Sequence, residues 1–337
     1  MNQQQIDEMY MRRCLQLARN GMQNAKPNPM VGAVIVSSHP SPGPSRGRGG
    51  FLNTPPSGGA GGGVTCIIGE GYHVRCGEGH AEVNAFASVR PEDEHLLKDA
   101  TIYVSLEPCA HYGKTPPCCD LIIRKGVKRC VVGCVDPFAK VQGRGIQKIR
   151  EAGIEVTVGV LEKECQQLNK RFFTYHQHHR PYILLKWAQT ANGFIDDHGQ
   201  ALALSTPYTK MLVHKLRSEY DAILVGRVTD EREHPQLNVR EWYGKDPVRI
   251  VLGKNTQGES GMSSPLWGER EGLQSLMVEG GRQTLQSFID AGLWDEIRIE
   301  TSPKTVTGGT SAPQLPEEIK LQQEQFVDGN IIRTYKK

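Results

Sequence analysis

Short apolar runs alternate with helically periodic segments over the first 160 residues of the chain. The runs have the length and β-branched content of strands, and they lie at 31–36, 65–73, 100–108, 129–135 and 154–160. The segments between them repeat apolar residues every three or four positions, and they lie at 5–20, 80–89, 118–125 and 144–151. This alternation predicts an α/β layered domain.

The pattern starts again after a helical segment that ends in a polar connector. We therefore predict two domains, 1–174 and 175–337, and we interpret the run HQHHR at 176–180 as a solvated connector without a metal role. The predicted strands of the second domain lie at 182–190, 221–228, 247–253, 275–281, 295–302 and 330–335. Helices are predicted at 207–219 and directly after 281, so the second domain is again α/β.

Residues 37–64 interrupt the first domain with a flexible composition. They contain nine Gly, five Pro and five Ser among 28 residues, which predicts a disordered loop. The apolar runs on either side of it would pair as neighbouring antiparallel strands. Because loop entropy grows slowly with length, this lengthened hairpin turn need not prevent folding.

Length, charge and cysteine content narrow the class of protein. The 337 residues fit two domains at roughly 150 residues each. The net charge of +3 and the absence of a basic stripe argue against nucleic acid as a partner. No apolar run approaches the roughly 18–20 residues of a membrane span, and the first residues lack a signal-peptide core. We expect a cytoplasmic protein with no membrane partner, in which nine cysteines serve as thiols or metal ligands.

One histidine and two cysteines have the pattern of a catalytic zinc site. His80 and Glu82 form an HxE triplet at a predicted helix start, Cys109 follows a predicted strand within EPC, and Cys118 comes nine positions later. Zinc deaminases carry HxE followed by PCxxC, so only the spacing between the cysteines is longer here. Three protein ligands leave the fourth tetrahedral position open for water. Each of these residues alone would more often be structural, but the combination favours a metal.

Glu82 is the predicted acid–base residue of this site. Zinc lowers the pKa of a bound water to about 7, and a carboxylate beside the metal can carry the proton to a ring nitrogen and a departing amine. The alternative is a structural zinc site, which predicts a fourth protein ligand. The other seven cysteines are expected to be structural. Cys119 is adjacent to a ligand but should point elsewhere along a helix, and the periodic core positions are those of Cys14, Cys66, Cys76, Cys130, Cys134 and Cys165.

Several longer strings resemble the bifunctional deaminase and reductase of riboflavin biosynthesis. They include KPNPMVGAVIV at 26–36, GHAEVNA at 79–85, YVSLEPCAHYGKTPPC at 103–118 and VDPFAKVQGRGI at 135–146. The resemblance continues through RPYILLKWAQ, LRSEYDAILVG, VEGG and SFIDAGLWDEIRIE, and covers nearly the whole chain outside 37–64. It implies a cytidine-deaminase-like three-layer domain followed by a dihydrofolate-reductase-like α/β domain.

The resemblance also implies two successive reactions on one small molecule. The family deaminates 2,5-diamino-6-(5-phosphoribosylamino)pyrimidin-4(3H)-one with zinc and then reduces the ribosyl group to ribityl with NADPH. It places zinc on His80, Cys109 and Cys118 and acid–base work on Glu82. Asn28 resembles a family residue near the pyrimidine, with an ordinary Asx turn as the alternative. Lys114 could meet the substrate phosphate or be a solvated loop lysine.

In the second domain the resemblance assigns two sets of contacts. The cofactor contacts are Ala188, Thr229, Glu233, Gly281, Arg282, Gln283, Thr284, Leu285, Gln286 and Ser287. The substrate contacts are Arg217, Leu237, Arg240 and Glu279, although each arginine alone would more often be a surface charge. The strand, glycine turn and helix start of VEGGRQTLQS also suit phosphate binding by backbone N–H groups. These domains commonly pair, so we expect a homo-oligomer.

The second domain departs from the family pattern at three places. Glu233 stands where an Asp normally meets the cofactor, and Asn192 replaces a common Asp. The stretch 252–276 lacks room for at least one strand and helix, which would expose sheet edges and core. These departures motivate an alternative in which the chain is a monofunctional deaminase with a degenerate reductase half that serves as a scaffold.

Overall fold

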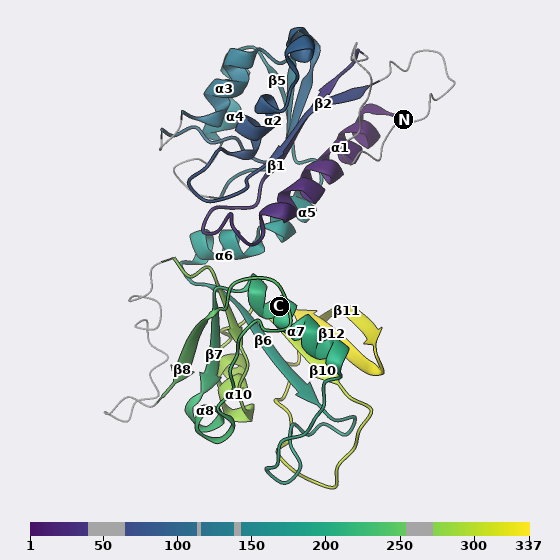
Figure 1. Ribbon diagram of the computed structural model, residues 1–337, viewed down its shortest axis with the longest axis vertical. Helices are drawn as coiled ribbons and strands as arrows, with labels where there is room; N and C mark the ends of the chain where they lie inside the picture. Colours follow the sequence, from purple (N-terminus) through teal and green to yellow (C-terminus); the bar gives the residue numbers. More distant parts are fainter. Residues whose placement is uncertain (40–64, 113–115, 138–142, 254–271) are drawn as a thin grey trace. The chain divides into compact units, whose positions relative to one another are not determined.

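The chain divides into two compact units, Met1–Gln177 and His178–Lys337 (Figure 1). The computed structural model describes residues 1–39, 65–112, 116–137, 143–253 and 272–337. The predicted loop at 37–64 and the shortened stretch at 252–276 therefore lie largely outside the described residues. Each unit contains one sheet with helices on both faces, which is the predicted α/β class.

The sheet of the first unit has the order β2-β1-β3-β4-β5. Its strands are β1 (Gly32–Ser37), β2 (Cys66–Tyr72), β3 (Thr101–Leu106), β4 (Arg129–Cys134) and β5 (Glu155–Val158). β1 pairs antiparallel with β2 and β3, whereas β3, β4 and β5 run parallel. The predicted antiparallel pairing across the insert is thus confirmed.

Both faces of this sheet are covered, which explains why β1 is apolar at nearly every position. All six β1 residues are buried, as expected for a strand packed on both sides. The helices of the unit are α1 (Gln3–Ala18), α2 (Ala81–Ala87), α3 (Cys118–Lys125), α4 (Arg144–Glu151), α5 (Glu162–Leu168) and α6 (Lys170–His178), with 3₁₀ turns at Arg19–Gly21 and Pro91–Asp99. Side chains of α2, α3 and α4 share one core cluster, and those of α1 and α5 share another. α1 lies so close to β1 that a Cβ on Gly32 would meet the Cys14 carbonyl oxygen at 2.0 Å.

The sheet of the second unit has the order β11-β12-β10-β6-β9-β7-β8. Its strands are β6 (Tyr182–Gln189), β7 (Ala222–Gly226), β8 (Val248–Leu252), β9 (Ser275–Val278), β10 (Glu296–Thr301), β11 (Lys320–Val327) and β12 (Asn330–Lys336). The five strands from β10 to β8 run parallel, and β12 pairs antiparallel with β10 and β11. α10 (Arg282–Asp290) packs into the core cluster on one face of the sheet. α7 (Pro207–Glu219) contributes Leu216 to the cluster on the other face, and α8 (Arg227–Glu233) follows β7.

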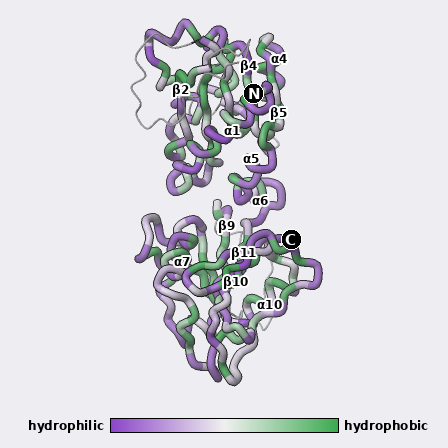
Figure 2. Tube along the Cα trace, turned by 90° about the vertical axis from the view of Figure 1, so that its right-hand side faces the viewer, coloured by the Kyte–Doolittle hydropathy of each residue, from purple (hydrophilic) through white to green (hydrophobic). Residues whose placement is uncertain are grey.

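Four details differ from the sequence-based expectations or add to them. β11 was not predicted, because all but the last of its eight residues are exposed and its sequence lacks an apolar alternation. α8 was also missed, since none of its side chains is buried. The run at 176–180 is not wholly a connector, because α6 extends to His178. Phe172 is the buried residue of this helix. Figure 2 shows that the helix is largely hydrophilic. Cys76 is exposed, so its assignment to a core position was wrong.

The edge strand β8 shows the exposed sheet edge expected from the shortened stretch. Its residues Val248 and Val251 are 44% and 39% exposed, and its only described partner strand is β7. No helix in the described ranges is both long and apolar enough to cross a lipid bilayer.

Candidate active sites

Three side chains from the first unit converge on one point at the ends of two helices. The Nδ1 atom of His80 lies 3.6 Å from Sγ of Cys109 and 3.3 Å from Sγ of Cys118. All three donor atoms lie within 4.8 Å of one another, and they form the only such group of potential metal ligands in the described part of the chain. The sequence-based prediction that these three residues come together therefore agrees with the geometry.

Local structure explains why the donors meet. His80 is the N-cap of α2 and Cys118 is the first residue of α3. Cys109 follows β3, and its Sγ accepts a hydrogen bond from the Cys118 backbone N–H at 3.3 Å. Two helix N-termini thus point their partial positive charge at the thiols, which favours the thiolate form.

The donor set fits a zinc ion. Tetrahedral coordination with Zn–S near 2.3 Å and Zn–N near 2.0 Å requires sulfur–nitrogen separations of about 3.5 Å, close to the two distances observed. Hydrogen bonds from the Cys118 thiol and from the His80 ring lower the pKa of Cys109 to about 4. The hydrogen bond to Cys109 and burial raise the pKa of Cys118. Two soft donors and one imidazole within this distance are a ligand set that zinc favours.

Glu82 lies beside the donor set and does not belong to it. It is in the first turn of α2, is 3% exposed and is in hydrogen-bonding contact with the Cys118 thiol. Burial and the negative charge of Cys109 raise the pKa of Glu82 to about 7, and a bound dication would lower this pKa again. A carboxyl group that titrates near neutral pH can both accept and donate a proton during a reaction.

Asn28 and His73 adjoin the donor set through the ring of His80. The Asn28 amide nitrogen donates to Nε2 of His73 at 3.1 Å, and Nδ1 of His73 donates to the Gly79 carbonyl at 3.2 Å. The His73 ring meets the His80 ring edge-on, with centroids 5.3 Å apart. The hydrogen bond to His73 fixes the orientation of the Asn28 amide. Lys114 lies outside the described residues.

Glu107 is a buried carboxylate whose role the sequence did not reveal. Its Oε2 accepts from the backbone N–H groups of Gly143 and Asp136 at 2.9 and 3.3 Å, and its Oε1 accepts from Gly145 at 3.0 Å. A Cβ on Gly145 would approach the Pro108 carbonyl oxygen to 2.0 Å. Glu107 therefore ties the start of α4 against the strand end that carries Cys109.

Replacing Glu107 by Gln is expected to loosen this anchor. One carboxylate oxygen becomes an NH₂ group that faces backbone N–H donors in either orientation, and an unmatched buried donor costs about 1–3 kcal/mol. We expect a lower thermal unfolding midpoint of the first unit and weaker zinc retention during dialysis against a chelator. The exposed Glu151→Gln change on α4 is the matched control, and equal behaviour of the two variants would contradict the anchoring role.

A second polar cluster lies at the carboxyl ends of the strands in the second unit. Nη2 of Arg217, on α7, donates to Oε2 of Glu279, which follows β9, at 2.6 Å, and both side chains are 13% exposed. Nε of Arg217 and Oε1 of Glu279 are buried without a hydrogen-bond partner in the described structure. Burial raises the pKa of Glu279, but the charges of Lys186 and Arg217 outweigh burial and hold it below its usual value. Sequence reasoning missed Lys186, whose only signal was a charge within an apolar strand.

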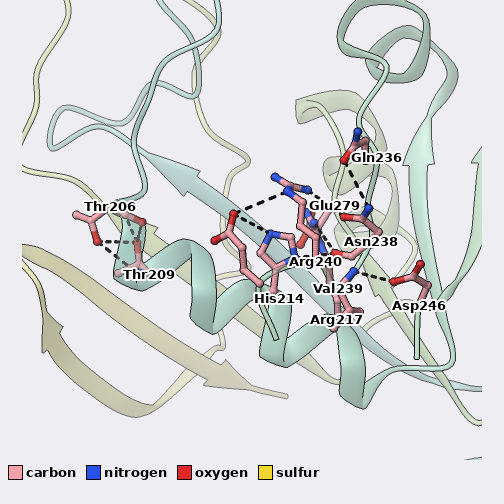
Figure 3. Close-up of polar contacts among 11 residues, drawn as sticks. Thr206, Thr209, His214, Arg217, Gln236, Asn238, Val239, Arg240, Asp246 and Glu279 are labelled. Atoms are coloured by element: carbon pink, nitrogen blue, oxygen red, sulfur yellow. Dashed lines mark hydrogen bonds and ion pairs between the residues drawn. The ribbon is translucent and has the colours of Figure 1, made fainter. Parts of the chain in front are cut away.

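The loop after α8 carries two of the other predicted substrate contacts, Leu237 and Arg240, of which Figure 3 labels Arg240. Leu237 is buried, with a left-handed backbone φ of +54°, whereas the Arg240 side chain is 51% exposed. The Asn238 carbonyl between them accepts from His214 Nδ1 at 2.7 Å and from Arg217 Nη1 at 3.3 Å. The structure thus brings Arg217, Glu279 and this loop together.

The predicted cofactor contacts gather at the start of α10. Gly281 is the N-cap of this helix, and its backbone N–H donates to Oγ1 of Thr229 on α8 at 3.1 Å. A Cβ on Gly226 would meet Oγ1 of Thr284 at 2.3 Å, so β7 and α10 approach closely at this point. Ala188 is half-buried near the end of β6, while Glu233 is exposed on the last turn of α8. Most of this set therefore lies near one helix N-terminus, with Glu233 at the other end of α8.

Two family models match the sequence. The model described as "Cytidine and deoxycytidylate deaminase zinc-binding region" matches residues 60–134. The model described as "RibD C-terminal domain" matches residues 181–263 and 268–333. The predicted fold class is thereby confirmed, with a cytidine-deaminase-like α/β domain followed by a dihydrofolate-reductase-like α/β domain.

Full-length relatives cover both halves of the chain. The riboflavin biosynthesis protein RibD of Aquifex aeolicus is 36% identical over 355 residues, covering 92% of this chain and 91% of the relative. RibD of Escherichia coli K12 is 31% identical, with 88% of each chain covered. Among solved structures, a diaminohydroxyphosphoribosylaminopyrimidine deaminase/5-amino-6-(5-phosphoribosylamino)uracil reductase of Thermotoga maritima superposes with a TM-score of 0.81 at 31% identity. Acinetobacter baumannii RibD gives 0.81 at 26% identity, and both alignments cover 99% of each chain.

Proposed function

The chain belongs to the RibD family of riboflavin biosynthesis enzymes, which combine a deaminase with a reductase, and from this premise we propose its substrates and cofactors. The first unit deaminates 2,5-diamino-6-(5-phosphoribosylamino)pyrimidin-4(3H)-one. The second unit then reduces the ribosyl group of the deaminated product to ribityl with NADPH. The alternative of a scaffold-like second half is not favoured, because relatives match over both halves of the chain.

The observation that carries the deaminase proposal is the three-donor set with a buried carboxylate beside it. His80, Cys109 and Cys118 would hold zinc, which when bound acidifies water and thereby supplies a nucleophile at neutral pH. Glu82 would accept one proton from the attacking water and deliver it to the ring nitrogen, and would then pass the remaining hydroxyl proton to the departing amine. Ammonia leaves as the C–N bond breaks and a C–O bond replaces it.

Substrate orientation in this unit would depend on Asn28. Its amide nitrogen is engaged by His73, so its oxygen is directed to an N–H or amino group of a pyrimidine. Lys114 remains a proposed contact for the substrate phosphate, by the family pattern alone.

The reductase proposal is supported by the two unsatisfied polar atoms of the Arg217–Glu279 pair. Buried polar groups are normally hydrogen-bonded, so a ligand hydroxyl or carbonyl is expected to complete the pair. Lys186, whose charge acts on Glu279, would supply a proton to the sugar oxygen as hydride reaches the neighbouring carbon. Leu237 and Arg240 would then contact the same substrate from the loop.

NADPH is proposed to bind at the start of α10. The backbone N–H groups of a helix N-terminus attract phosphate, and the residues from Gly281 to Ser287 would provide this site together with Thr229 and Ala188. Glu233 is the weakest member of the set, because it lies at the far end of α8. We also propose a cytoplasmic location and a homo-oligomeric state, with small molecules and neither nucleic acid nor membrane as partners.

Metal analysis tests the proposed function of the first unit. We expect about one zinc per chain in the purified protein, ammonia release from the diaminopyrimidinone, and loss of both after Cys109→Ser. The exposed Cys76→Ser change is the matched control and should alter neither. Zinc-loaded protein that releases no ammonia would overturn the deaminase assignment, and a fourth protein ligand seen by cobalt spectroscopy would favour a structural metal site instead.

A further inference from the structure

The segment 237–239 of the second unit is held in a backbone conformation that it would not adopt alone. Leu237 has a φ of +54°, in the left-handed region that non-glycine residues rarely occupy. Such conformations persist only where the surrounding structure over-determines them, and they concentrate at ligand sites. The contacts that restrain this segment therefore indicate which residues position the adjoining Arg217–Glu279 site.

Three restraints surround Leu237. Its side chain is buried in the core cluster that contains Val225 and Met277. The Val239 backbone N–H donates to Oδ1 of Asp246 at 2.8 Å. The Asn238 carbonyl receives the shortest of these hydrogen bonds, 2.7 Å, from His214 (Figure 3).

The acceptor identifies the tautomer of His214. A carbonyl oxygen can only accept, so Nδ1 of His214 must carry a proton. The ring is 3% exposed, and burial lowers its pKa, with the charges of Arg217 and Arg240 acting in the same direction. Nε2 faces Glu241 at 3.7 Å, beyond hydrogen-bonding distance. His214 is therefore an N–H donor through Nδ1, built into α7.

His214 and Arg217 stand one helical turn apart on α7, so they face the loop together. Arg217 also reaches the Asn238 carbonyl, at 3.3 Å, while its other terminal nitrogen is bonded to Glu279. The shorter hydrogen bond, from His214, thus holds the loop in place. The Arg217 guanidinium can then keep its alignment with the Glu279 carboxylate. The Asn238 carbonyl thus connects the loop both to His214 and to the Arg217 side chain of the ion pair.

We propose that His214 is a positioning residue of the reductase, which through the Asn238 carbonyl fixes the loop of Leu237 and Arg240 relative to the Arg217–Glu279 pair. This inference rests on the proposed function, because it assumes that these four residues meet the pyrimidine substrate. No comparison described above assigns a role to His214. Its loss should weaken substrate binding in the second unit and leave the first unit untouched.

The test compares His214→Leu with His214→Asn in the full-length protein. Asn places an N–H donor close to the position of Nδ1, whereas Leu preserves volume without a donor. For His214→Leu we expect the KM of reduction for the deaminated pyrimidine to rise at least tenfold, in line with the cost of misplacing a contact by about 1 Å. The KM for NADPH and the rate of ammonia release should be unchanged, and His214→Asn should recover most of the loss.

Amide hydrogen exchange gives a readout that does not require turnover. Residues 237–242 should exchange faster in His214→Leu than in the wild type, and should return towards the wild-type rate in His214→Asn. The exposed Lys210→Ala change on the same helix is the control. Should His214→Leu not fold, His214→Gln replaces it, because the longer side chain carries its amide past the Nδ1 position.

The possible outcomes distinguish the positioning role of His214 from the proposed reductase function. An unchanged KM and unchanged exchange in the variant without the donor would overturn the positioning role, as would equal losses in the Leu and Asn variants. A wild-type protein that oxidises no NADPH would refute the proposed reductase function, whereas loop loosening reversed by Asn would still establish the clamp on Asn238.

Discussion

Glu82→Gln is expected to lower the rate of ammonia release by at least about 10²-fold, the usual contribution of a positioned general acid–base group. The amide preserves the shape of the side chain in the first turn of α2 but cannot take up a proton. Because His80, Cys109 and Cys118 supply all three donors, the zinc content should stay at the wild-type value. Ammonia release from saturating substrate and metal content by mass spectrometry measure the two effects.

A nearby carboxylate provides the control for this experiment. Glu78 lies four positions earlier and its side chain is 51% exposed, in a loose ion pair with Arg75. Glu78→Gln should leave both rate and zinc unchanged. If Glu82→Gln retained turnover, Glu82 would have no part in the proton transfers, and loss of zinc in that variant would place the carboxylate on the metal instead.

Glu279→Gln is expected to lower reduction by about 10²-fold or more, with deamination unaffected. The substitution removes the carboxylate that pairs with Arg217 and leaves the charges of Arg217 and Lys186 uncompensated in a buried site. The geometry of the polar cluster is then lost as well as its charge, and such misplacement typically costs about 10²-fold in rate. Steady-state NADPH oxidation with the deaminated pyrimidine measures the loss.

The sign of the pKa shift at Glu279 adds a pH expectation. Its pKa lies below the usual value, so the carboxylate stays ionised through the neutral and mildly acidic range, and the ion pair is lost only as pH falls through that lowered pKa.

The control for the Glu279→Gln substitution is Glu324→Gln, which breaks an exposed ion pair with Arg333 in the same unit. A wild-type rate in Glu279→Gln would contradict the assignment of this cluster to substrate binding.

The three candidate metal ligands could be predicted from sequence because each lies near the boundary of a helix or a strand. His80 is the N-cap of a helix, Cys109 follows a strand that ends at Leu106, and Cys118 begins a helix, so short motifs already indicate their structural context. Glu107 lies within the same motif, but its partners come from residues 29–38 positions later in the chain. No local pattern shows that its carboxylate is shared among backbone N–H groups.

The second unit was harder to predict because its polar cluster is assembled over long distances. Arg217 and Glu279 are 62 positions apart, and the loop whose Asn238 carbonyl accepts a hydrogen bond from Arg217 has a polar sequence without periodicity. β11 was missed for a related reason, since a strand exposed on both faces needs no apolar alternation. The structure of β11 depends on its pairing with β12 and not on the pattern of its own side chains.

The departures from the family pattern differ in their structural consequences. Asn192 donates its amide N–H to the Val306 carbonyl at 2.7 Å, a bond that an ionised Asp could not make. Glu233 is exposed and carries no such local explanation. The departure at 252–276 lies largely outside the described residues, among which β8 is an edge strand with exposed valines. The parallel core of β10, β6, β9 and β7, which carries the polar cluster, is nevertheless complete.

A coupled assay on the purified full-length protein tests the central claim most directly. The phosphoribosylaminopyrimidine substrate is supplied to zinc-loaded protein, ammonia release is followed to completion, and NADPH absorbance is then recorded after addition of the cofactor. We expect one ammonia released and one NADPH oxidised for each substrate molecule. Ammonia release without NADPH oxidation would contradict the claim that one chain carries both reactions, and a preparation that releases no ammonia would contradict the whole account.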